Sequence, residues 1–141
     1  GIVSRTGGTG FGFNARVNFM IPTWGDFKLE FKLIGDDVFA GFSFVDVTSS
    51  FTDIGFCISV NLSTYYLYEV GTNILNFGGR LPTDALRIER SGGDVKYYVN
   101  DALRYTQPLS SPTQFSSGFM VFDSTLAGPG SRIENILLTY L

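Results

Sequence analysis

The stretch RIERSGGDVKYYVNDALRYTQ, residues 87–107, decides the fold class of this chain. It contains two turn signals, at 92–93 and 100–101, where Gly-Gly and Asn-Asp tolerate the positive φ values of a tight hairpin turn. Between these turns, residues 95–99 alternate with the period of a β-strand. The stretch therefore predicts three antiparallel strands folded back on one another. The predicted core-facing residues of the middle strand are Val95, Tyr97 and Val99.

The same alternation recurs along most of the chain, and helical periodicity is hard to find. In DFKLEFKLI (26–34), apolar and charged residues alternate as in a half-buried antiparallel strand. VFAGFSFVD (38–46) is apolar on both faces, as in a central strand covered on both sides. The only cysteine, Cys57, lies in an apolar run and is expected to be buried. We expect about ten strands, at 11–19, 26–34, 38–46, 54–61 (with Ile54, Phe56, Ile58 and Val60 on one face), 65–70, 85–90, 95–99, 102–107, 118–123 and 132–141.

Length and composition narrow the possible classes. A chain of 141 residues suits a single domain spanning 1–141, with residues 1–10 as a flexible lead-in. The formal charge is −3 and no run of Lys or Arg occurs, so nucleic-acid binding is not expected. No apolar stretch approaches the roughly 20 residues of a spanning helix, so membrane insertion is not expected either. The absence of His and the single Cys exclude disulfide frameworks, Cys/His zinc sites and His-based triads.

The order of strands and turns resembles the concanavalin A-like lectin/glucanase superfamily, which includes laminin-G-like and jelly-roll modules of bacterial and phage surface proteins. The shared pattern is a strand ending in a basic residue, a tight turn, a Val-x-Tyr strand, an Asn-led turn and a strand with an aromatic residue, which residues 87–107 follow. The segments 118–123 and 132–141 extend the resemblance over roughly residues 11–141. It implies an all-β, antiparallel two-sheet β-sandwich of jelly-roll type, with its first and last strands close together.

The acidic residues do not fit catalysis of the kind found in this superfamily. Its retaining glucanases carry Glu-x-Asp-x-x-Glu on one strand, and no such triplet occurs here. We therefore expect no enzymatic activity. The loop 46–53 offers Asp46 and Asp53 as calcium ligands, but without regular ligand spacing it is interpreted as a plain polar loop. No cofactor is expected, with calcium as the alternative.

Aromatic and polar side chains mark a candidate ligand-binding surface. In YYLYEV (65–70), Tyr66 and Tyr68 share one face, opposite Tyr65 and Leu67. Such tyrosines can form a platform for the apolar faces of sugars, or they can simply pack in an aromatic-rich sheet. Trp24 is either a ligand-stacking ring or a plug over a sandwich edge. The candidate ligand-binding residues are Trp24, Asn61, Tyr66, Tyr68, Arg87, Lys96, Tyr98 and Arg104.

The resemblance implies a non-catalytic, lectin-like carbohydrate-binding or adhesion module that recognises a cell-surface glycan or receptor. We expect it to belong to a larger or multimeric surface or phage protein, with an extracellular, cell-surface or virion location. The alternative is a structural virion or surface-fibre subunit whose sandwich mediates assembly into a homo-oligomer. The low content of charged residues and the 14 Phe residues suit that alternative, because such a surface can be buried against other copies.

Overall fold

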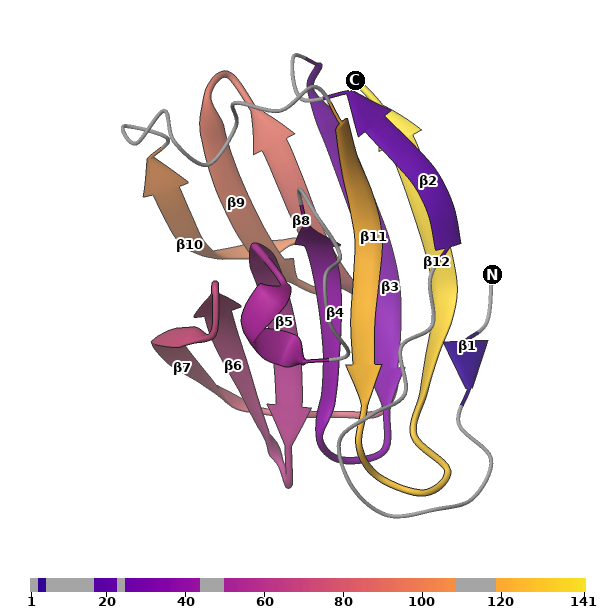
Figure 1. Ribbon diagram of the computed structural model, residues 1–141. Helices are drawn as coiled ribbons and strands as arrows, with labels where there is room; N and C mark the ends of the chain where they lie inside the picture. The colour runs from indigo at the N-terminus through magenta and orange to yellow at the C-terminus, as the bar shows by residue number, and fades with distance from the viewer. Residues whose placement is uncertain (1–2, 5–16, 23–24, 44–49, 109–118) are drawn as a thin grey trace.

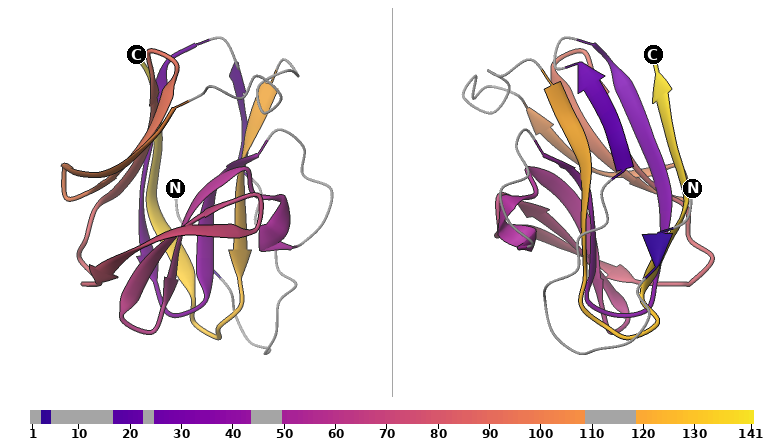
Figure 2. Two further views of the ribbon diagram at one scale, coloured as in Figure 1. Left: turned by 90° about the vertical axis from the view of Figure 1, so that its left-hand side faces the viewer. Right: turned by 45° about the vertical axis from the view of Figure 1, so that its right-hand side comes forward.

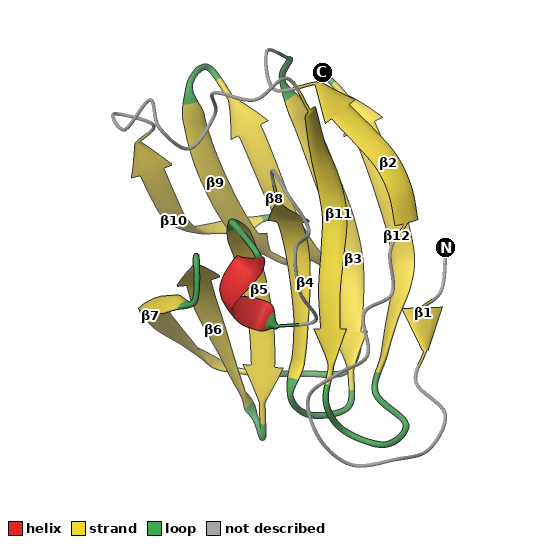
Figure 3. Cartoon of the chain, in the orientation of Figure 1, coloured by secondary structure: helices red, strands yellow, loops and turns green. Residues whose placement is uncertain are grey.

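The computed structural model describes residues 3–4, 17–22, 25–43, 50–108 and 119–141, and it is a sandwich of two antiparallel sheets (Figure 1). Sheet A has six strands in the order β1-β12-β3-β8-β9-β10. Sheet B has six strands in the order β2-β11-β4-β5-β6-β7. A single turn of 3-10 helix, η1 (Phe51–Asp53), precedes β5, and Figure 3 shows it beside the outer surface of sheet B.

The strand bounds are as follows. Sheet A contains β1 (Val3–Ser4), β12 (Arg132–Tyr140), β3 (Phe27–Ile34), β8 (Leu86–Ser91), β9 (Asp94–Val99) and β10 (Ala102–Pro108). Sheet B contains β2 (Val17–Pro22), β11 (Phe119–Leu126), β4 (Val38–Ser43), β5 (Phe56–Asn61), β6 (Thr64–Glu69) and β7 (Thr72–Gly79). The all-β, two-sheet fold predicted from the sequence is confirmed, and Figure 2 shows the two layers from the side.

The hydrophobic core lies between the two sheets. In β3 every second residue is buried, as the alternation in 26–34 predicted. Phe27 of β3 meets Phe42 of β4 edge to face, with ring centroids 5.2 Å apart, so aromatic contacts join the sheets directly. All six residues of β4 are buried, which confirms the prediction of a central strand covered on both sides.

The hairpins predicted in residues 87–107 are present. Gly92 and Gly93 adopt φ values of 61° and 89°, and Asn100 and Asp101 adopt 50° and 61°. These turns pair β8 with β9 and β9 with β10. The predicted inner face of β9 is also correct, since Val95, Tyr97 and Val99 are all buried.

Several boundaries differ from the prediction. β1 and β7 were not predicted, and β11 continues to Leu126, beyond the predicted end of this strand at residue 123. The expectation that Ile54 shares a face with Phe56 is wrong, because Ile54 precedes β5 and joins a separate hydrophobic cluster. β1 pairs with β12, so the first and last strands are neighbours. The predicted strand segment 11–16 and most of the proposed lead-in lie outside the described residues.

The structure describes no helix that is long and apolar enough to span a membrane.

Candidate functional site

The structure divides the predicted ligand-binding residues between two opposite surfaces. Tyr66 and Tyr68 lie on the side of β6 that faces away from the core, so they belong to the outer face of sheet B. Tyr98 and Arg87 lie on the outer face of sheet A, together with Lys96 on β9. Because the core separates the two sheets, these outer faces point in opposite directions. The candidates therefore cannot act together on one small ligand.

Two further predicted ligand-binding residues, Arg104 and Trp24, are not placed with either group of candidates. Arg104 is exposed and lies where the pairing of β10 with β9 shifts register, so it stands outside the regular alternation of its strand. Trp24 lies outside the described residues.

On sheet A, the outer face is a lattice of charged side chains. Opposite residues across β8 and β9 pair Arg87 with Tyr98 and Glu89 with Lys96. The Arg87 guanidinium carbon lies 3.9 Å from the centroid of the Tyr98 ring, and Arg87 Nε lies 3.4 Å from Glu89 Oε2. Arg87 also donates to the Asp101 carboxylate. One face of the Tyr98 ring is thus covered by a cation that has acidic partners, which leaves it poorly placed to stack on a sugar.

On sheet B, η1 covers part of the outer face and forms a second, smaller hydrophobic cluster. Phe51 of η1 stacks on Phe39 of β4 with ring centroids 4.5 Å apart, and it meets Tyr68 edge to face at 5.6 Å. Cys57 belongs to this cluster and is fully buried, as the sequence predicted. Burial raises the pKa of the Cys57 thiol far above its ordinary value, so a reactive thiolate is disfavoured.

The part of this face beyond η1 carries two tyrosines and two asparagines. The half-buried rings of Tyr66 and Tyr68 have centroids 6.4 Å apart. Across the β6–β7 pair, Asn76 lies opposite Tyr66 and Asn73 lies opposite Tyr68. Both asparagines are exposed, and the Asn73 side chain hydrogen-bonds Tyr68. We refer to Tyr66, Tyr68, Asn73 and Asn76 as the tyrosine–asparagine platform.

The platform is electrically neutral. Burial raises the pKa of the Tyr68 hydroxyl above its ordinary value of 10.0, so this hydroxyl keeps its proton at physiological pH. The two amides carry no charge and offer both donors and acceptors. The arrangement can therefore stack against an apolar surface and hydrogen-bond polar groups around its edge.

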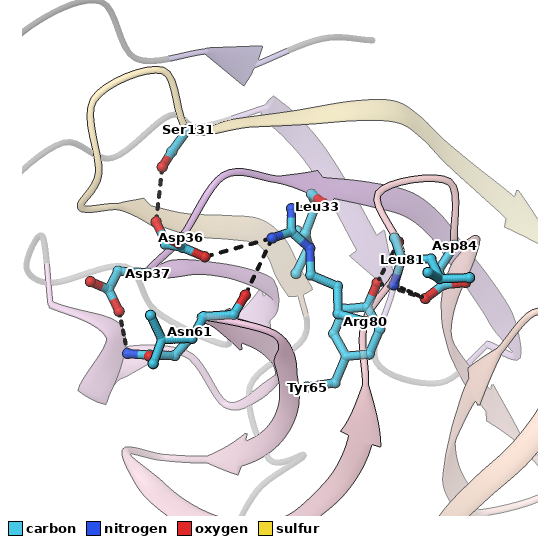
Figure 4. Close-up of polar contacts among 10 residues, drawn as sticks. Leu33, Asp36, Asp37, Asn61, Tyr65, Arg80, Leu81, Asp84 and Ser131 are labelled. Carbon is cyan, nitrogen blue, oxygen red and sulfur yellow. Dashed lines mark hydrogen bonds and ion pairs between the residues drawn. The ribbon is translucent and has the colours of Figure 1, made fainter.

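Asn61 lies on the same outer face, at the end of β5, but its amide already has a partner. Its Nδ2 donates to Asp37 Oδ1 in the turn between β3 and β4, as Figure 4 shows. Arg80 lies in the same cluster, where it donates to the carbonyl of Leu62 and lies 3.6 Å from Asp36 Oδ1. These contacts tie neighbouring turns together at one end of the sandwich. They give Asn61 a structural role beside the platform.

Two buried acids face the interior instead of either outer surface. The Tyr97 hydroxyl of sheet A donates to Glu69 Oε1 of sheet B at 3.1 Å. The Tyr65 hydroxyl donates to Asp84 Oδ2 at 3.2 Å. Burial raises the pKa of Glu69 above its ordinary value of 4.5. Both carboxylates are thus held by tyrosines inside the sandwich and are not presented to a ligand on the platform.

The calcium alternative rested on Asp46 and Asp53. Asp53 is the last residue of η1, and Asp46 lies outside the described residues. Within the part of the chain that the structure describes, no three His, Cys, Asp or Glu side chains are grouped so that they could hold a metal ion.

Sequence reasoning missed Asn73, Asn76 and Phe51. The pairing of β7 with β6 shifts register twice, which breaks the period-2 signal of TNILNFGG. The sequence signal that could have revealed β7 is Gly71. Val70 and Gly71 form a tight turn with φ values of 47° and 73°, and such a turn after a strand predicts a further hairpin strand. Phe51 carried no local signal, because its role depends on distant partners in β4 and β6.

Comparisons with known proteins give structural neighbours but no sequence relatives. No protein-family model matches the chain, and no curated protein sequence matches it. The TRIM65 PSpry domain superposes with a TM-score of 0.65 at 13% identity, covering 89% of this chain and 71% of that domain. The carbohydrate-binding module CBM66 from Bacillus subtilis superposes with a TM-score of 0.58 at 14% identity, covering 96% of this chain and 90% of the module.

A polysaccharide-degrading enzyme is also among the neighbours. The alginate lyase AlgAT5 of polysaccharide lyase family 7 superposes with a TM-score of 0.58 at 13% identity, covering 91% of this chain and 68% of the enzyme. At such identities the superpositions establish the fold and leave the function open. All three neighbours are concanavalin A-like sandwiches, and this chain therefore has the concanavalin A-like jelly-roll fold that its strand pattern resembles.

Proposed function

We propose that the protein is a non-catalytic carbohydrate-binding module that uses the outer face of sheet B. The observation that carries this proposal is the tyrosine–asparagine platform, where two tyrosine rings 6.4 Å apart stand beside two exposed amides on a face without Lys or Arg among its described strand residues. Sheet A offers no equivalent, since Arg87 covers the ring of Tyr98.

The chemistry of the platform suits a saccharide. A pyranose ring presents an apolar C–H face that stacks on an aromatic ring, and its hydroxyls form hydrogen bonds around the edge. Tyr66 would supply the stacking surface, while Asn73 and Asn76 would supply donors and acceptors. Two structural neighbours, a carbohydrate-binding module and an alginate lyase, are named for carbohydrates, which supports the same class of ligand.

Two acids on the strands of sheet B are buried, which favours binding over hydrolysis. Asp123 on β11 is buried, and its carboxylate accepts a hydrogen bond from Ser43. Glu69 points into the core, where Tyr97 is its partner. Neither carboxylate is displayed towards a bound sugar as an acid or nucleophile would have to be.

The proposed site is shallow, so each single contact is weak and multivalent display would strengthen it. We therefore also propose an extracellular, cell-surface or virion location, within a larger or multimeric protein that engages glycans or a glycan-bearing receptor. These proposals follow from the kind of ligand, because glycan surfaces present many copies of the same epitope.

The test is binding to a glycan array at high protein concentration. Tyr66→Ala should abolish the signal, because it removes the stacking ring while leaving the core of β6 intact. Tyr98→Ala is the matched control, since it removes another half-buried outward tyrosine from the opposite sheet. Circular dichroism should show both variants folded. A signal that survives Tyr66→Ala, or that Tyr98→Ala removes, would refute the proposal.

A second candidate function, assembly, is favoured by the edge of sheet B. β7 has eight residues and carries neither a charged residue nor a proline, which are common protections of an edge strand. Ile74 on this strand is 37% exposed, and Val70 in the adjoining turn is 56% exposed. Edge-to-edge pairing of copies through β7 would give an oligomer. Sedimentation analysis of wild type and Ile74→Lys decides: loss of concentration-dependent oligomers on substitution supports assembly, and a monomer at all concentrations rejects it.

A further inference from the structure

Positive charge is segregated onto one sheet. Of the eight Lys and Arg residues that the structure describes, seven lie on strands of sheet A and one, Arg80, lies between β7 and β8. Within the ranges that the structure describes, no strand of sheet B contains a Lys or an Arg. The seven on sheet A are Lys28, Lys32, Arg87, Arg90, Lys96, Arg104 and Arg132.

The described cation nearest in sequence to the tyrosine–asparagine platform is Arg80, which is already engaged by Asp36 and by the carbonyl of Leu62. Two acids belong to the same outer face. Asp53 belongs to η1, which packs against Tyr68 through Phe51. Asp123 on β11 lies in the cross-strand row that runs through Gly41 and Cys57 to Tyr68. An anionic ligand on this platform would thus meet neither Lys nor Arg among the described strand residues of the face.

An acidic sugar would find no cation there, and the neutral amide donors would replace the hydration of its charged group only in part. Proteins that recognise carboxylate, sulfate or phosphate groups do so with Arg, Lys or arrays of backbone amides, since removing an anion from water is costly without such partners. An uncharged sugar needs only a ring to stack on and neutral hydrogen-bonding groups, which Tyr66, Asn73 and Asn76 provide.

We infer that the outer face of sheet B selects uncharged saccharides and rejects sugars that carry carboxylate or sulfate groups. This inference rests on the proposed carbohydrate-binding function and specifies its ligand class. The charged residues on sheet A favour the same site. Charged groups hold water strongly, so the neutral outer face of sheet B is the one that can lose its water at low cost when a ligand binds.

The experiment uses matched pairs of oligosaccharides with the same linkage and stereochemistry: mannose with mannuronate, glucose with glucuronate, and galactose with galacturonate oligomers. Affinity electrophoresis and calorimetry measure binding of the full chain to each member. In every pair that binds, the neutral member should bind at least about tenfold more tightly, which corresponds to roughly 1.4 kcal/mol. An acidic member that binds as tightly as its neutral partner, or more tightly, would overturn the inference.

A charge placed on the platform should relax this selectivity. Asn76→Lys adds a cation opposite Tyr66, and it should shift the neutral-to-acidic affinity ratio by at least about threefold towards the acidic sugar. Asn76→Gln is the neutral comparison, because it alters the same exposed amide without adding a charge, so its effect on affinity should be equal for both members of a pair. An unchanged ratio in Asn76→Lys would mean that the sugar is bound elsewhere.

Four outcomes distinguish a failure of the inferred selectivity from a failure of the proposed carbohydrate-binding function. Neutral binding that Tyr66→Ala abolishes supports both. Acidic binding that Tyr66→Ala abolishes keeps the proposed function and refutes the selectivity. If that acidic binding also disappears in Arg5→Ala or Arg16→Ala, the cation comes from residues outside the described part of the chain. If no member of any pair binds, the proposed function and the inference both fail.

Discussion

The two outer faces of the sandwich differ in charge and in packing. That of sheet A is a charged lattice in which Arg87, Glu89 and Lys96 neighbour one another across two strands. That of sheet B is neutral, and part of it is packed into a second hydrophobic cluster under Phe51 of η1. The same fold thus has a charged outer face on sheet A and, on sheet B, a neutral outer face that can exchange water for a ligand. Four predictions probe this difference, from the largest expected effect to the smallest.

The largest effect is expected at Gly41, in the middle of sheet B. A Cβ atom on this residue would lie 1.8 Å from the carbonyl oxygen of Phe56, a backbone contact that cannot be relieved without moving β4 from β5. Gly41→Ala should therefore lower the free energy of unfolding by at least about 3 kcal/mol. Chemical denaturation measures this loss. Gly79→Ala is the control, because nothing lies within 4 Å of its Cβ position; a Gly41→Ala protein as stable as that control would contradict the close approach.

The second prediction concerns η1, which covers part of the outer face of sheet B. Phe51→Ala removes ring contacts with Phe39 and Tyr68 and should cost about 2 kcal/mol. On sheet A, Tyr98→Ala removes an outward ring that contacts the Arg87 guanidinium and should cost less than about 1 kcal/mol. Urea unfolding of the two variants side by side gives the comparison. Equal losses would show that the outer face of sheet A is packed as well as that of sheet B.

A pH effect should arise between the sheets, at Glu69. Because burial raises the pKa of this carboxyl when the protein is folded, the folded state binds more protons than the unfolded state just above pH 4.5. The free energy of unfolding should fall as pH rises through the interval between 4.5 and the raised value, by roughly 1.4 kcal/mol for each unit that separates the two. Glu69→Gln keeps an acceptor for Tyr97 and removes the charge.

In thermal melts from acid to neutral pH, the Glu69→Gln variant should therefore lose that part of the pH dependence and gain stability at pH 7. Asp101→Asn, which alters an exposed acid of a turn in sheet A, serves as the control and should leave the dependence in place. Parallel pH profiles for Glu69→Gln and wild type would show that Glu69 is not the group concerned.

The smallest effect is expected from the ion pairs on sheet A. Arg87 and Glu89 lie on an outward, partly solvated surface, where such pairs contribute well under about 1 kcal/mol and are screened by salt. A double-mutant cycle of Arg87→Ala and Glu89→Ala should give a coupling energy below about 0.5 kcal/mol, smaller still in high salt. A coupling that stays large in high salt would reveal a tighter network than the lattice described above.

The sequence predicted local features well and spatial relations poorly. Alternation in 26–34 and the turn residues 92–93 and 100–101 determine structure over a few residues, and all of these predictions are confirmed. The same alternation placed Tyr98 opposite the core face of its strand and grouped Tyr66 with Tyr68 on one face, and the structure shows that both of these faces point away from the core. Alternation could not show that the two strands lie in different sheets, because strand order depends on pairings between segments far apart in the chain.

The candidate site illustrates the same limit. Half of the platform comes from β7, where register shifts hide the strand pattern. Phe51 packs against Phe39 and Tyr68 only because the fold brings η1 onto β4 and β6. The neutral character of sheet B was equally hidden. Counting charges over the whole chain gives a mixed surface, and only the assignment of each strand to its sheet separates the two faces.

The pairing of β1 with β12 has a practical consequence for handling this protein. Both strands lie at the edge of sheet A, on the opposite side of the sandwich from β7 and its asparagines (Figure 1). A bead, a fluorophore or a designed trimerisation tag joined after Leu141 would be tethered away from Tyr66. Copies arrayed through that tether would therefore present their platforms outwards. Weak single contacts could then be measured as avidity, without altering any residue of the face under test.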